Sequence, residues 1–186
     1  MNKSAKLQDI AEAIALDRLY PGALRPVPGS GNPDARLVII GEAPGKQEDQ
    51  LGEPFVGRSG KVLDKMLDQI GLDRDQVFIT NVVKYRPPEN RDPSQAEISK
   101  SIKYLEQQLA VINPELILLM GRYALNIFFP GVKISEAHSK LYKKDDRLYI
   151  PLFHPATTLY NPNNQQILSE GFAIVQQALS KIKKFK

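Results

Sequence analysis

Three residues of this sequence combine chemically capable side chains with positions at the ends of short apolar runs. They are Glu42, Asn81 and His154, which offer a carboxylate, an amide and an imidazole. Carboxylates and imidazoles can stabilise charge that develops in a transition state, and a fixed amide presents a donor pair and an acceptor in one plane. Such an amide suits the edge of an amide-like heterocycle. Together the three side chains indicate a site for chemistry on a polar ligand.

Each of the three residues also has a plainer interpretation. A carboxylate such as that of Glu42 loses solvation at the end of a buried strand unless it is paired or functional. Asn81 stands before two apolar residues, so its amide is either hydrogen-bonded within the protein or used by a ligand. His154 precedes Pro155, which favours an extended backbone, and it could be a satisfied core histidine. On its own, each residue would leave these alternatives open.

Two glycines and an aromatic residue extend the candidate site. Gly41 and Gly45 bracket a tight turn after the first apolar run, where a ligand could approach the backbone closely. Their spacing matches neither a P-loop nor a dinucleotide-binding fingerprint. Phe55 lies in a predicted loop, from which an aromatic ring can stack on a base. The alternatives are a plain strand-to-loop turn and a ring that fills the core.

Apolar periodicity predicts the elements that must position these residues. Four short apolar runs predict strands at residues 36–40, 77–82, 115–120 and 148–153. Helical spacing predicts helices around residues 7–14, 59–70, 94–112, 122–129 and 164–183. Within the longest central helix, Glu97 is placed to complete a capping box with Ser94. Residues 131–147 are expected to be irregular or to form a hairpin.

The alternation of short strands with helices predicts an α/β fold, a three-layer α/β/α sandwich around a central four-stranded parallel sheet. Ligands of such folds bind beyond the carboxyl ends of the strands, where Glu42, Asn81 and His154 lie. The 186 residues fit one domain. That domain would have an N-terminal helical arm over about residues 1–20 and a basic C-terminal tail over about residues 181–186.

Composition excludes several classes of site. The sequence has no cysteine, which rules out disulfides, thiolate catalysis and cysteine-ligated zinc or iron–sulfur clusters. Only His138 and His154 are available as imidazole ligands, which argues against a histidine zinc site. No apolar run approaches the ~20 residues that span a bilayer, and the N-terminus lacks the apolar segment of a secretory signal. A cytoplasmic protein without a membrane partner is therefore expected.

The charge of the chain is unevenly distributed. The formal net charge is +4, and residues 131–186 hold nine basic against four acidic residues, a net of +5. The excess comes from Lys140, Lys143, Lys144 and the segment 181–186. A basic region of this kind is typical of proteins that bind a phosphate backbone, and the alternative is a solubilising tail.

Taken together, these segments resemble the family-4 uracil-DNA glycosylases. The resemblance runs from about Gly29 to Pro162, and it is specific because its motifs occur in one order and spacing. The motifs occupy residues 29–32, 38–45, 48–49, 52–60, 79–84, 86–88, 90–93, 97, 154–156, 159 and 161–162.

The resemblance implies a role for each candidate residue. Phe55 would stack on a uracil flipped out of DNA, and Gly41 would also lie against the base. Asn81 would read the Watson–Crick edge of the base. His154 would donate a hydrogen bond to uracil O2, and Glu42 would orient the attacking water or stabilise the cationic sugar. The residues implied to contact DNA are Gly45, Arg58, Ser59, Pro155, Tyr160 and Leu159, which resembles the wedge that enters the base stack.

The predicted function is hydrolysis of the N-glycosidic bond of uracil in DNA, by base flipping and water attack, to leave an abasic site. The predicted partner is uracil-containing DNA, and a monomer is expected. Two alternatives remain open. One is a module that binds uracil or abasic DNA without turnover. The other is a glycosylase for another deaminated base, such as hypoxanthine or xanthine.

The sequence departs from the family in two places. Family-4 enzymes usually hold an iron–sulfur cluster on four cysteines, and Tyr85 and Ser101 stand at two of those positions, with the other two near Ile14 and Asp17. No cofactor and no metal are predicted, so ordinary packing must hold the N-terminal arm. Tyr160 replaces an arginine that often follows the wedge leucine. Glu42 argues against the related family-5 enzymes, which usually lack an acid there, and no basic loop of the covalently trapping subgroup is present.

Overall fold

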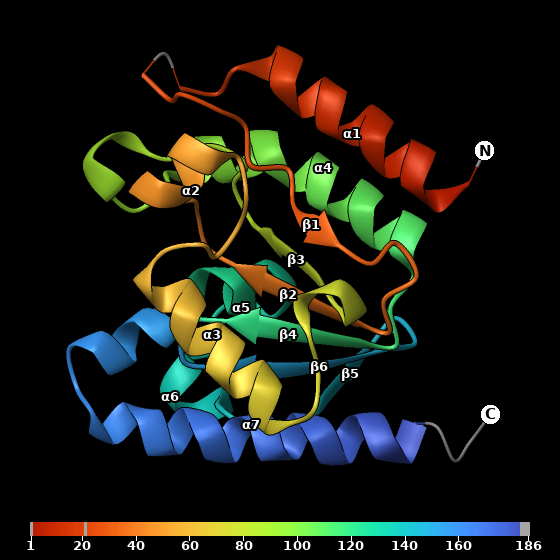
Figure 1. The fold of residues 1–186 in the computed structure, drawn as a ribbon, viewed down its shortest axis with the longest axis vertical. Coiled ribbons are helices and arrows are strands. Elements are labelled where there is room, and N and C mark those ends of the chain that lie inside the picture. The colour runs from red at the N-terminus through yellow and green to blue at the C-terminus, as the bar shows by residue number, and fades with distance from the viewer. Residues whose placement is uncertain (1, 21, 183–186) are drawn as a thin grey trace.

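The computed structural model of the protein describes residues 2–20 and 22–182, arranged around one twisted sheet (Figure 1). The sheet has six strands in the order β1-β3-β2-β4-β6-β5. The strands are β1 (Ser30–Gly31), β2 (Leu37–Gly41), β3 (Phe78–Asn81), β4 (Leu116–Met120), β5 (Tyr142–Lys144) and β6 (Arg147–Leu152). The four central strands pair in parallel, as predicted, and β1 and β5 add antiparallel edges that complete the sheet.

Helices cover both faces of the sheet. They are α1 (Lys3–Asp17), α2 (Lys46–Leu51), α3 (Arg58–Gln69), α4 (Gln95–Ile112), α5 (Arg122–Phe128), α6 (Ile134–Ala137) and α7 (Asn163–Ile182), with 3-10 turns η1 (Arg74–Gln76), η2 (Pro88–Asn90) and η3 (Pro155–Leu159). The predicted three-layer α/β/α sandwich is therefore confirmed, and Figure 1 shows α3 and α7 crossing one side of the sheet.

The sheet has an apolar core on each face, because the side chains of its buried strands alternate between the two faces. Successive side chains of a strand point to opposite faces, so Leu37 and Ile39 join the core under α3 and α7. Val38 and Ile40 join the core under α4 and α5. Every residue of β2 and β4 is buried. Continuous apolar runs of this kind are what a parallel sheet covered on both faces requires.

Most predicted boundaries agree with the structure to within about two residues, and the predicted capping box is present. Ser94 caps α4, where its hydroxyl accepts from the Glu97 N–H at 3.3 Å and the Glu97 carboxylate accepts from the Ser94 N–H at 2.6 Å. The interval 131–147 contains the short helix α6 and the strand β5, so the hairpin alternative holds in part. Helix α2 was not predicted, because its six mostly polar residues carry no apolar period.

The N-terminal helix α1 lies along α4, away from the sheet (Figure 1). A small core of Ile10, Ile14, Tyr20, Tyr85 and Tyr104 joins the two helices. At the other end of the chain, Lys181 falls in the last turn of α7, and residues 183–186 of the predicted basic tail lie outside the described residues. In the described ranges, no helix is both long and apolar enough to cross a membrane.

Candidate active site

A cavity of about 290 Å³ opens at the carboxyl ends of the parallel strands, where ligands of such folds bind. Gly41 and Asn81 end neighbouring strands in register with each other. His154 follows β6, and Glu42 follows β2. The residues that line the cavity are Glu42, Ala43, Pro44, Gly45, Glu48, Phe55, Ser59, Asn81, Pro87, Asn90, Arg91, His154 and Ala156. The structure therefore brings the carboxylate, the amide, the imidazole and the aromatic ring to one place.

The cavity floor depends on Gly41. A Cβ atom at this position would lie 2.6 Å from Cζ of Phe55 and would also overlap the Asn81 amide oxygen. Beyond the strand, the N–H groups of Val82 and Val83 donate to the carbonyls of Gly41 and Glu42 at 2.9 and 3.1 Å. These bonds extend the pairing of β2 with β3 to the edge of the cavity. Gly41 thus allows the amide and the ring to approach each other over a rigid backbone.

Phe55 forms a wall of the cavity from a strained backbone. Its φ is 53°, in the left-handed region that bulky residues rarely adopt. Only 4% of the residue is exposed, and its ring is part of the core under α3. The ring stacks on the His154 imidazole with centroids 5.5 Å apart and planes inclined by 26°. Both sequence interpretations therefore apply, because the ring fills the core and faces the cavity.

Asn81 is held by a buried lysine that the sequence analysis missed. Lys84 is 1% exposed, and its Nζ donates to the carbonyl oxygen of Asn81 at 2.7 Å, to Thr80 Oγ1 at 2.7 Å and to Gln108 Oε1 at 2.8 Å. Burial lowers the pKa of Lys84 to about 7. Within the described part of the chain the side-chain amide of Asn81 makes no hydrogen bond, which leaves it available to a ligand. In the sequence, the position of Lys84 directly after the apolar pair Val82 and Val83 could have indicated that this lysine is buried.

His154 is a neutral hydrogen-bond donor in this geometry. Its Nδ1 accepts from the Ala156 N–H at 3.2 Å, so Nε2 carries the proton of the neutral ring. Burial lowers the pKa of His154 to about 4, against the opposing effect of the Glu48 carboxylate. Gly121, at φ 91°, lets the ring pack closely, because a Cβ there would lie 3.2 Å from the His154 Cβ. The imidazole is thus fixed in one tautomer at neutral pH.

Glu42 is poised to titrate near neutrality. Burial and, to a smaller extent, the Asp92 carboxylate raise its pKa to about 7, while the Arg122 guanidinium opposes both. Arg122 is itself paired with Asp92 at 2.5 Å, so little net positive charge is left for Glu42. A carboxylate with a pKa in this range can accept a proton and also carry negative charge at slightly alkaline pH.

Some of the residues predicted to contact DNA line the cavity, and the others lie outside its lining. Gly45 and Ser59 line the cavity. Arg58 is exposed at the first position of α3, and Pro155 is buried at the start of η3. Leu159, at the end of η3, is 40% exposed, and the next residue, Tyr160, is 83% exposed. Neither lines the cavity, but they follow the cavity-lining Ala156 by three and four residues. An exposed leucine and tyrosine on one rim are apolar groups available to a partner.

Several cavity residues had no predicted role. Glu48 is buried, and its carboxylate accepts from the N–H groups of Gly45, Val56 and Gly57 at 3.1, 3.0 and 2.8 Å. It thereby joins the loop after β2 to the loop that carries Phe55. The position of Glu48, three residues after Gly45, is a capping-box spacing that could have revealed it. Asn90 and Arg91 reach the same cavity from η2, at positions that the motifs included without a role.

The residues at the predicted cluster positions do not fit an iron–sulfur cluster. Such clusters are held chiefly by cysteine thiolates, and the chain has none. The Tyr85 hydroxyl donates to the Ile14 carbonyl at 2.9 Å, and Ser101 is buried in α4. Asp17 accepts from the Tyr104 hydroxyl at 2.7 Å. These positions form a packed, hydrogen-bonded contact between α1 and α4.

Size alone would not have located the site. A larger cleft of about 560 Å³ lies at the opposite, amino-terminal ends of the strands, beside Leu37 and Leu179. Within the described ranges, no group of three or more histidines and acids could hold a metal ion. What distinguishes the smaller cavity is the convergence of an acid, an amide, an imidazole and an aromatic ring.

The chain is similar in sequence to known uracil-DNA glycosylases. A family model described as the uracil DNA glycosylase superfamily matches residues 28–181. A type-4 uracil-DNA glycosylase of Sulfurisphaera tokodaii is 40% identical, over 95% of this chain and 85% of its own length. One from Archaeoglobus fulgidus is 42% identical over 94% of each chain. A type-5 uracil-DNA glycosylase of Thermus thermophilus is 33% identical over 61% of this chain and 60% of its own.

Proposed function

We propose that this chain, which belongs to the type-4 family of the uracil DNA glycosylase superfamily, hydrolyses the N-glycosidic bond of uracil in DNA and leaves an abasic site. The observation that carries the proposal is the convergence of Glu42, Phe55, Asn81 and His154 around one cavity at the carboxyl ends of the strands. The relatives that share the family bear the name of this activity. The chain would act in base excision repair of DNA.

Recognition of uracil rests on the amide of Asn81 and the ring of Phe55. Uracil has a donor at N3 and an acceptor at O4, so a fixed amide can accept from the first and donate to the second. Cytosine reverses both, and a buried amide left with mismatched partners can discriminate by ~10⁴-fold or more. The backbone of Asn81 is fixed by its strand and by Lys84. Phe55 supplies the stacking surface of the pocket.

In bond cleavage, His154 would stabilise the negative charge that develops on uracil, and Glu42 would stabilise the positive charge that develops on the sugar. As the bond between C1′ and N1 breaks, the electron pair leaves with uracil and positive charge grows on the sugar. The neutral His154 donates from Nε2 to uracil O2, and the Glu42 carboxylate stabilises the sugar. A water then bonds to C1′ through its oxygen and passes a proton to Glu42. Both residues act mainly on charge that exists in the transition state.

The target base must leave the duplex before it can reach the cavity. We assign to Leu159 the role of the wedge that fills the vacated position, because it is an exposed leucine beside the cavity. Gly45, Arg58, Ser59, Pro155 and Tyr160 would contact the flanking DNA. Tyr160 offers a ring rather than a charge for this contact.

The remaining parts of the proposal concern the whole chain. We propose that it works without an iron–sulfur cluster, since the chain has no cysteine and Tyr85 packs against Ile14 at two of those positions. A monomer, a single domain with the arm 1–20 and the tail 181–186, and a cytoplasmic location stay predictions from the sequence.

The test is an excision assay on labelled oligonucleotides with one uracil, in single strands and in U·G and U·A duplexes. Abasic sites are cleaved with alkali. We expect cleavage that requires uracil and falls by ~10²–10³-fold in Asn81→Ala and His154→Ala. Gln8→Ala, an amide removed from the exposed face of α1, is the matched control and should cleave like the wild type.

The two alternatives are outcomes of the same assay. A folded protein that binds uracil-containing DNA and never cleaves it would be a binding module. Cleavage at hypoxanthine or xanthine with uracil left intact would identify a glycosylase for another base. Either result would overturn the proposed function.

A further inference from the structure

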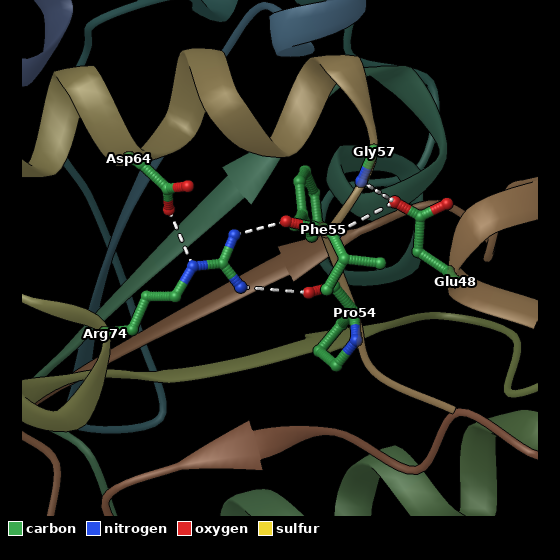
Figure 2. A network of polar contacts seen from close by, with 7 residues as sticks. Glu48, Pro54, Phe55, Gly57, Asp64 and Arg74 are labelled. Atoms are coloured by element: carbon green, nitrogen blue, oxygen red, sulfur yellow. Dashed lines mark hydrogen bonds and ion pairs between the residues drawn. The ribbon is translucent and has the colours of Figure 1, made fainter. Parts of the chain in front are cut away.

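The backbone of Phe55 is held in its left-handed conformation by charged groups on both sides (Figure 2). We propose that Arg74, oriented by Asp64, is a positioning residue for the base-stacking ring of Phe55. The inference rests on the proposed function, since it assigns a role to the wall against which the flipped base would stack. Arg74 does not line the cavity, so its effect on the reaction must pass through Phe55.

Arg74 binds the carbonyl side of this segment. From η1 its guanidinium donates through Nη1 to the Pro54 carbonyl at 3.1 Å and through Nη2 to the Phe55 carbonyl. Its Nε donates to Asp64 Oδ1 at 2.6 Å. Figure 2 shows the three bonds spread over one planar group, with Asp64 on α3 and the two carbonyls in the loop before it. A planar fork bound at three points has little freedom to turn.

Glu48 binds the amide side of the same segment. Its Oε1 accepts from Val56 N–H at 3.0 Å and from Gly57 N–H at 2.8 Å. The chain thus has two consecutive carbonyls on a guanidinium and two consecutive N–H groups on a carboxylate. Phe55 lies where the backbone passes from carbonyls bound by Arg74 to N–H groups bound by Glu48, and its φ there is 53°. The two charged groups together fix the orientation of its peptide units.

A close contact with α3 adds a third constraint. A Cβ at Gly60 would overlap the Phe55 carbonyl, so that carbonyl lies directly against the first turn of α3. The Phe55 carbonyl therefore occupies space that a side chain at position 60 would fill, and in this position it accepts from the Arg74 guanidinium. Without Arg74 the buried carbonyls of Pro54 and Phe55 lose their donors, and the strained backbone can relax toward the extended region.

Relaxation of this backbone would move the ring. Phe55 touches both the Gly41 floor and the His154 imidazole, so a shift of the ring changes the width of the pocket and the packing of the donor. A misplacement of about 1 Å in a reacting geometry can lower a rate by ~10²-fold. By contrast, the Arg74–Asp64 pair is partly exposed, with side chains 34% and 43% accessible, and such pairs contribute little to global stability.

The experiment is a double-mutant cycle on the full chain. Single-turnover excision of uracil from a U·G duplex is measured for the wild type, Arg74→Met, Phe55→Leu and the double variant, with thermal unfolding of each. We expect Arg74→Met to slow excision by roughly 10- to 100-fold. The double variant should be no slower than Phe55→Leu, because Arg74 has nothing left to position. Arg74→Lys, which keeps a donor but loses the fork, should fall in between.

The matched control is Arg36→Met, which breaks the pair of Arg36 with Glu115 at the far ends of the strands. That arginine side chain is 34% accessible, like Arg74, and its loss should leave excision unchanged. If Arg74→Met does not fold, Arg74→Lys and its double variant with Phe55→Leu complete the cycle. Losses that add in full, or an Arg74 variant as fast as the wild type, would overturn this inference alone. An inactive wild type would overturn the proposed function and the inference with it.

Discussion

The cavity end of the sheet and the contact between α1 and α4 differ in the kind of buried polar group that they hold. At the cavity, burial drives Glu42, Lys84 and His154 toward their neutral forms, which is a cost to the folded state. Between the helices, the hydroxyls of Tyr85 and Tyr104 are paired with backbone carbonyls and with Asp17.

We propose that this difference separates residues that serve the reaction from residues that serve the fold. Buried groups with shifted pKa values and open hydrogen-bonding positions gather where a ligand would complete them. The hydroxyls of Tyr85 and Tyr104 are already paired, in the region where the resemblance implies a cluster in other members of the family. We therefore expect substitutions at the cavity to lower the rate, whereas substitutions in the helix contact should lower stability alone.

The largest effect should come from the donor to the leaving base. We predict that His154→Ala lowers the single-turnover rate of uracil excision by ~10²–10³-fold, because it removes a hydrogen bond formed to developing negative charge. The loss of the stacked ring should lower the unfolding midpoint as well, so the rate is measured at a temperature where the variant is folded. A rate close to that of the wild type would place the chemistry elsewhere.

The next effect is a pH dependence set by Glu42. Because its pKa is raised to about 7 and the carboxylate is the active form, excision should fall as pH decreases below 7, by about tenfold per unit. His154, with its pKa near 4, should add no second limb between pH 5 and 9. The Glu42→Gln variant should be slow and flat over the same range. A wild-type profile without this limb would remove Glu42 from the mechanism.

A substitution in the contact between α1 and α4 should change the stability of the protein and leave the excision rate unchanged. Tyr85→Phe removes the hydroxyl that donates to the Ile14 carbonyl and should lower the free energy of unfolding by about 1 kcal/mol. Denaturant unfolding measures this change, and the excision rate of the folded protein should equal that of the wild type. A large loss of rate without a loss of stability would mean that the two regions are coupled.

A second change in stability should follow from removing the buried acid. The pKa of Glu42 is higher in the folded than in the unfolded protein, so stability falls as pH rises from about 4.5 to about 7 and stays low above it. Glu42→Gln should therefore raise the melting temperature at pH 8 and leave it almost unchanged at pH 4. An equal shift at both pH values would show that its ionisation plays no part.

Local patterns predicted much of this molecule, and long-range contacts account for what they missed. The four central strands and the placement of Glu42, Asn81 and His154 follow from short apolar runs and their ends, and the Ser94 cap follows from its spacing to Glu97. The missed helix α2 is short and polar.

The supports of the site were missed for a different reason. Lys84 meets Gln108 across 24 residues, and Arg74 meets Pro54 across 20, so no local period reveals either contact. The tyrosine contact was anticipated only at Tyr85, which the resemblance pointed out, because Tyr85 and Tyr104 reach α1 across 71 and 87 residues. The candidate side chains for the chemistry could be proposed from the sequence, whereas the side chains that hold them required the fold.

The most direct test of the account is the rate of uracil excision by the wild-type protein, with the iron content measured on the same sample. The account predicts excision from a U·G duplex by protein that holds no stoichiometric iron, because the cavity residues alone carry the chemistry. A folded, iron-free sample that binds the duplex and leaves the uracil in place would contradict it. So would a rate that rises in proportion to iron content.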